Sequence, residues 1–144
     1  MQVTQTITQI EPAADPTVVT PTYQPRQHMV YFNFDRDNIR PGEEQTIITA
    51  ADEIRQSRAS SVMIDGHADA AGPNDYNMAL SARRARTIEN ALIAQGVNRG
   101  IITTTPHGEE NLAVQTPDGV PEQANRRASI IYVPTMGTNS DLRM

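Results

Sequence analysis

Three charged residues in the middle of the chain have the types and spacing of a binding site for a zwitterion. Asp69 follows a β-branched run that ends at His67, and Arg83 and Arg84 lie in the long segment after Gly72-Pro73. A carboxylate binds an ammonium group, and an arginine fork binds a carboxylate through two parallel hydrogen bonds. We therefore predict a binding site, not a catalytic one, at this strand-to-helix junction.

Helical spacing separates the two neighbouring arginines. Asn77, Leu80 and Arg84 lie at positions i, i+3 and i+7, which fall on one face of a helix. This face begins beside the junction. We expect Arg84, not Arg83, to complete the site with Asp69.

Composition removes several classes of function. The 144 residues contain no cysteine and no lysine, so thiolate chemistry, disulfides and Schiff-base chemistry are excluded. The net charge of −5 argues against nucleic-acid binding through phosphate neutralisation. No apolar run reaches the roughly 20 residues of a membrane-spanning helix, and no signal-peptide pattern occurs at the N-terminus.

Hydrophobic periodicity predicts one α+β domain over residues 29–133. Residues 1–28 contain four prolines and are expected to form a linker or a disordered segment, and 134–144 a disordered tail. We expect strands at 29–34, 61–67, 100–105 and 127–133, and helices at 41–56 and 74–95, the second capped by Asn74 or Asp75. The order β-α-β-α-β-β predicts two long helices on one face of a small mixed four-stranded sheet.

Two other functions remain open from the residues alone. Asp65, His67 and Asp69 alternate along the second strand, so they are expected on one face with ligand types that bind a metal, and a metal-dependent hydrolase is an alternative. The polar linker and the acidic surface fit an assembly or interaction module, which is the second alternative.

Five motifs, in order and spacing, resemble the OmpA-like peptidoglycan-binding domain over about residues 29–133. They are Tyr31-Phe32-Asn33-Phe34-Asp35, Gly66-His67-Ala68-Asp69-(x)2-Gly72, Tyr76-Asn77-(x)2-Leu80-Ser81-(x)2-Arg84-Ala85, Gly108-Glu109-Glu110-Asn111 and Asn125-Arg126-Arg127. The sequence departs from the family pattern at His107, where an aromatic residue is common, and at Ala128, where valine is usual.

The resemblance implies non-catalytic binding of the diaminopimelate in the peptidoglycan stem peptide, without a cofactor or a metal. Asp69 and Arg84 would bind its ammonium and carboxylate groups. Phe34, Asp35, Leu80 and Asn77 would line the same pocket, while Arg126 and Arg127 would be structural. It also implies a periplasmic location, a role in anchoring an outer-membrane or periplasmic protein to the wall, and possible fusion upstream to an outer-membrane barrel or a lipoprotein anchor.

Overall fold

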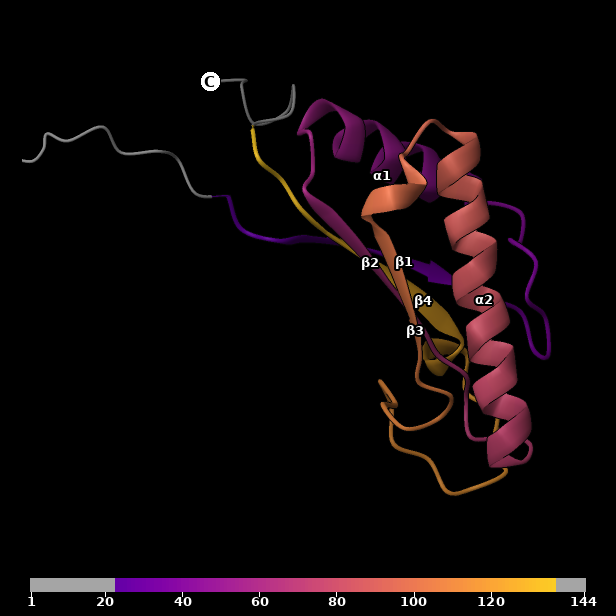
Figure 1. The fold of residues 1–144 in the computed structure, drawn as a ribbon. Coiled ribbons are helices and arrows are strands. Elements are labelled where there is room, and N and C mark those ends of the chain that lie inside the picture. The colour runs from indigo at the N-terminus through magenta and orange to yellow at the C-terminus, as the bar shows by residue number, and fades with distance from the viewer. Residues whose placement is uncertain (1–22, 137–144) are drawn as a thin grey trace, which may run out of the picture.

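The fold is a four-stranded sheet with two helices, in the order predicted (Figure 1). The structure is a computed structural model and describes residues 23–136, so most of the expected linker and tail lies outside the described residues. The elements are β1 (Arg26–Tyr31), α1 (Glu44–Gln56), β2 (Ser61–Gly66), α2 (Asn74–Ala94), β3 (Ile102–Pro106) and β4 (Arg127–Val133), with short 3-10 helices η2 (Arg99–Ile101) and η3 (Gln123–Asn125).

The strand order is β1-β4-β2-β3, with β4 antiparallel to both of its neighbours and β2 parallel to β3. The predicted mixed sheet is therefore confirmed. Tyr31 at the end of β1 pairs with Arg127, and Gly66 at the end of β2 pairs with Ala128. The ends of β1 and β2 and the start of β4 consequently meet at one edge of the molecule, which we call the junction end of the sheet.

The core lies between one face of the sheet and the two helices, which cover the same side of it (Figure 1). On β4 the alternation is as predicted, with Ala128, Ile130 and Tyr132 in the core. These side chains pack with apolar residues of the other elements: Val30, Ile47, Ile54, Val62, Ile64, Ile88 and Leu92. Burial of this apolar surface fixes the register, because a slip by one residue would turn each strand over.

Element boundaries differ from the predictions where tertiary contacts decide them. β1 begins at Arg26 instead of Met29, because residues assigned to the linker pair with the last residues of β4. It ends at Tyr31 instead of Phe34. The first helix begins at Glu44 instead of Pro41, since Gly42 adopts a left-handed φ of 94° that interrupts a helix.

The start of α2 also differs from the prediction. Pro73 occupies the N-cap position in extended conformation, without a side-chain cap hydrogen bond, and Asn74 is already helical. The expected cap by Asn74 or Asp75 is therefore wrong.

Further along the helix, α2 lies directly against β2: a Cβ built on Gly66 would be 2.0 Å from the Ser81 carbonyl oxygen. Only glycine permits this close approach, which brings α2 to the junction end of the sheet.

Candidate functional site

A pocket of about 300 Å³ opens at the junction end of the sheet. Its lining comes from the segment after β1, the turn after β2 and the first two turns of α2: Phe34, Asp35, Asp69, Ala71, Gly72, Pro73, Tyr76, Asn77 and Leu80. Five of the six residues predicted for the site thus line one pocket. The sixth, Arg84, does not line it. The volume is at the lower end of the range for small-ligand pockets.

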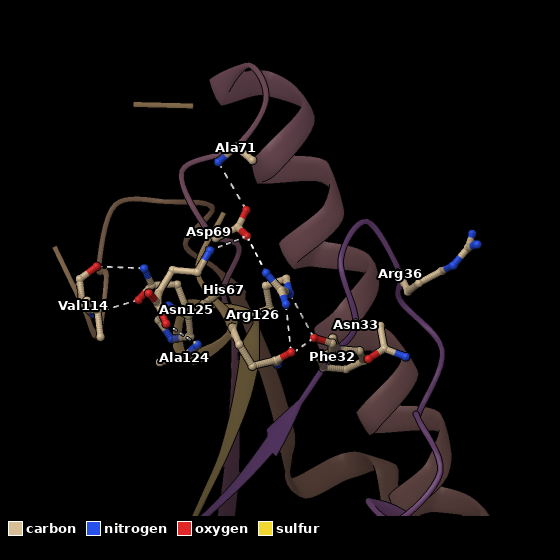
Figure 2. Close-up of polar contacts among 12 residues, drawn as sticks. Phe32, Asn33, Arg36, His67, Asp69, Ala71, Val114, Ala124, Asn125 and Arg126 are labelled. Carbon is tan, nitrogen blue, oxygen red and sulfur yellow. Dashed lines mark hydrogen bonds and ion pairs between the residues drawn. The ribbon is translucent and has the colours of Figure 1, made fainter. Parts of the chain in front are cut away.

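Asp69 lines this pocket and is only 4% exposed. Figure 2 shows the hydrogen bonds that its carboxylate accepts. One carboxylate oxygen accepts the Ala71 amide at 3.2 Å. The other accepts the Glu122 amide at 3.1 Å and Arg126 Nη1 at 2.9 Å. A carboxylate has about four acceptor positions, so one remains for a ligand.

Arg84 does not line the pocket and is fully buried. Its guanidinium donates to three main-chain carbonyls: Arg36 at 2.8 Å, His67 at 2.9 Å and Asn33 at 3.2 Å. Burial lowers the pKa of Arg84 to about 10, with the charge of Asp69 acting in the opposite direction. The group is therefore still cationic at neutral pH, and its charge acts on Asp69 and Asp35, two carboxylates that line the pocket.

Arg126 is the side chain that pairs directly with Asp69, and the sequence reading left it outside the site. Its three nitrogens bind Asp69, the Phe32 carbonyl at 3.2 Å and Gln123 Oε1 at 2.8 Å. Figure 2 shows it between Asp69 and the end of β1. Arg126 stands directly before β4, which is the antiparallel neighbour of both β1 and β2. This position was the signal that could have placed Arg126 at the junction end of the sheet.

Asn77 and Leu80 occupy the α2 side of the pocket, as their shared helix face predicts. Asn77 is 1% exposed and donates to the Gly72 carbonyl at 3.2 Å and to Glu109 Oε1 at 2.9 Å. It therefore holds the turn after β2 in place. Leu80 is 4% exposed and supplies an apolar wall.

Asp35 and Tyr76 close the outer side of the pocket. Asp35 adopts a left-handed φ of 55°, which is uncommon for a residue other than glycine. Its carboxylate accepts the Tyr76 hydroxyl, and this hydrogen bond raises the pKa of Tyr76. The loop after β1 is thereby joined to α2 across the pocket mouth.

The alternative metal cluster is not assembled. Asp65 lies 3.3 Å from His107 Nε2, His67 stacks on His107 with ring centroids 4.8 Å apart, and Asp69 pairs with Arg126. The expectation of one common face is wrong because β2 ends at Gly66, so strand alternation does not extend to Asp69. Over residues 23–136, no three His, Cys, Asp or Glu side chains form a metal-binding group.

Within that same range, no helix has the length and apolarity needed to cross a membrane.

Comparison with known proteins agrees with the geometry. A family model described as the OmpA family matches residues 31–127. The chain is similar to the peptidoglycan-associated lipoprotein of Pasteurella multocida, with 37% identity over 109 residues, covering 76% of this chain and 73% of that protein. It is also similar to outer membrane porin F of Pseudomonas fluorescens, with 33% identity over 98 residues, 68% of this chain but 30% of the porin.

A solved structure shares the fold. The crystal structure of the peptidoglycan-associated lipoprotein from Burkholderia pseudomallei superposes with a TM-score of 0.66 and 27% identity, covering 72% of this chain and 88% of that chain. The match of the family model over most of the domain, the level of identity and the shared fold lead to one conclusion: the chain belongs to the OmpA family.

Proposed function

We propose that this chain binds peptidoglycan without catalysis, through the diaminopimelate of the stem peptide, and so anchors an envelope protein to the cell wall. The names of its relatives, peptidoglycan-associated lipoprotein and outer membrane porin, support an outer-membrane-associated location, and we place the domain on the periplasmic side. The observation that carries the proposal is a small pocket lined by two carboxylates, Asp35 and Asp69, on both of which the charge of the buried Arg84 acts.

The free end of a diaminopimelate side chain is a zwitterion on a methylene chain, and each part has a counterpart here. The ammonium group would lie between Asp35 and the remaining acceptor position of Asp69. The methylene chain would pack on Leu80.

The carboxylate of the ligand has positive potential available from two sources. One is Arg84, whose buried charge acts on Asp35 and Asp69, and the other is the α2 N-terminus, which has no side-chain cap and borders the pocket at Pro73. Because all three guanidinium nitrogens of Arg84 already bind carbonyl groups, we propose that it acts mainly through its charge. Direct contact between Arg84 and the ligand would require this fully buried side chain to become exposed.

The test is calorimetric titration with a stem tripeptide that ends in diaminopimelate. We expect Asp35→Asn to weaken binding about three- to tenfold, since it removes a charged acceptor while asparagine tolerates the left-handed backbone of this position. Asp69→Asn should weaken it more, because this carboxylate is buried. A tripeptide with lysine in the third position lacks the second carboxylate and should bind more weakly.

The matched control is Asp52→Asn, the same change on a side chain 49% exposed on α1, a helix that contributes no residue to the pocket. It should leave affinity unchanged. Absence of heat with either tripeptide would refute wall binding through this pocket and favour an assembly module. Equal affinity for the two tripeptides would refute selectivity for diaminopimelate.

A further inference from the structure

Two aromatic rings stand exposed at the pocket. Phe34 is 55% exposed and Tyr76 is 43% exposed, and both line the pocket. The other large exposed apolar side chains among the described residues are aliphatic and lie elsewhere: Met63, Val114, Val120 and Met136. Exposed aromatic surface gathered at one pocket, instead of scattered singly, indicates a contact surface for a ligand.

Both rings are held in place before any ligand arrives. The Tyr76 hydroxyl donates to Asp35, and the Arg83 guanidinium carbon lies 5.9 Å from the Tyr76 ring centroid. The Arg126 guanidinium carbon lies 5.8 Å from the Phe34 ring centroid. Since each ring has a cation near one face, less side-chain entropy is lost when a ligand packs on it.

We infer that Phe34 and Tyr76 form an aromatic subsite for the sugar of the glycan strand from which the stem peptide extends. This inference rests on the proposed function, because the stem peptide brings the sugar to the pocket. A sugar ring has an apolar face of C–H groups and a polar edge of hydroxyl and acetamido groups. Aromatic rings match the face, and the charged side chains of Asp35, Asp37 and Arg83 beside them match the edge.

The chemistry of the stem places the sugar within reach of these rings. Two amino acids separate the diaminopimelate from the sugar, and an extended chain spans roughly 3.3–3.6 Å per residue. With diaminopimelate inside the pocket, the sugar would therefore lie outside it, up to roughly 7 Å from the diaminopimelate. The exposed parts of the Phe34 and Tyr76 rings are available to it there. The pocket of about 300 Å³ does not have room for both.

Calorimetry with two ligands tests the subsite: the free tripeptide ending in diaminopimelate, and the same tripeptide on the N-acetylglucosaminyl-N-acetylmuramyl disaccharide. The wild-type protein should bind the disaccharide form about three- to tenfold more tightly, the gain expected for an aromatic contact. Tyr76→Ala should lose most of this gain, measured as the ratio of its affinities for the two ligands, so that any change in affinity for the free tripeptide cancels. Tyr76→Phe should retain the gain, because it keeps the ring.

Met63→Ala is the control, since Met63 is 47% exposed on β2 and lies outside the pocket. Two results would overturn the subsite without overturning the proposed peptide binding: no gain in the wild type, or a gain in Tyr76→Ala as large as in the wild type, which includes an equal loss of affinity for both ligands. Binding of neither ligand by the wild type would instead overturn the proposed function and the subsite with it.

Discussion

Arg84 joins three segments of the chain through a single side chain. Its guanidinium binds carbonyl groups at Asn33 and Arg36, in the loop after β1, and at His67, directly after β2. Its carbon lies 5.1 Å from the Phe32 ring centroid. The same residue therefore supplies charge to the pocket and holds the loop that carries Phe34 and Asp35.

Replacing Arg84 should affect the whole fold. In Arg84→Met, three carbonyl groups lose their donor, and we expect the free energy of unfolding to fall by about 2–4 kcal/mol, measured by urea denaturation. Arg84→Lys should recover only part of this loss, since an ammonium group cannot reproduce the planar fork.

The neighbouring arginine provides the control. Arg83 has a side chain 47% exposed and pairs with Asp37 at 2.9 Å on the surface. Arg83→Met should change the unfolding free energy by less than about 1 kcal/mol, because exposed ion pairs contribute little. Equal effects of the two methionine variants would contradict a structural role for Arg84.

At the scale of elements, periodicity predicted the strands, the helices and their order because buried faces repeat at 2.0 and 3.6 residues. It placed β4 at Arg127–Val133 without error. It could not place the ends of β1, since pairing with β4 decides them, nor the start of α2, where an extended proline takes the cap position.

The lining of the pocket was predictable to the same degree. A helix face identified Asn77 and Leu80 as neighbours of the junction, and the family motifs added Phe34 and Asp35. Helical spacing predicted the face of the helix on which Arg84 lies. It did not predict that the side chain is fully buried, because burial depends on the loop that covers it. The sequence did not indicate that Arg126 pairs with Asp69 or that Tyr76 pairs with Asp35, since these partners are 57 and 41 residues apart in sequence.

The contact between β2 and α2 gives a prediction at this scale. Gly66→Ala should push α2 away from β2, because the new Cβ would lie 2.0 Å from a main-chain oxygen of Ser81. We expect a loss of about 1–3 kcal/mol in unfolding free energy and weaker binding of the diaminopimelate tripeptide, since α2 lines the pocket.

Gly100→Ala is the matched control. Its nearest contact would be 3.2 Å, to the side-chain oxygen of Asn98, which can move. It should leave affinity unchanged. If Gly66→Ala bound the tripeptide with wild-type affinity, the packing of α2 on β2 would not determine the geometry of the pocket.

For the whole molecule, His67 makes stability depend on pH. It is 6% exposed, its Nδ1 atom is buried with no hydrogen-bond partner, and burial lowers its pKa from 6.5 to about 4, with Arg127 acting in the same direction. The unfolded chain therefore takes up a proton at a higher pH than the folded protein. This group therefore does not change the free energy of unfolding above about pH 6.5, and it lowers that free energy progressively as the pH falls from about 6.5 to 4.

His67→Phe isolates this contribution. The ring that stacks on His107 is kept, and no hydrogen bond of Nδ1 is lost. The free energy of unfolding of the wild type, measured by urea denaturation, should fall by up to about 1.4 kcal/mol per pH unit between about pH 6.5 and 4. That of the variant should fall less steeply. Identical slopes would assign the acid sensitivity to other groups.

The position of the pocket relative to the ends of the described chain has a mechanical consequence. β1 enters the sheet at Arg26, which pairs with Tyr132, and β4 leaves it one residue later at Val133, whereas the pocket lies beyond Tyr31 at the opposite end. A pulling force between a bound wall and either end of the described chain would run lengthwise along these strands. The hydrogen bonds between these strands would then be loaded in shear, all at the same time, instead of breaking one after another.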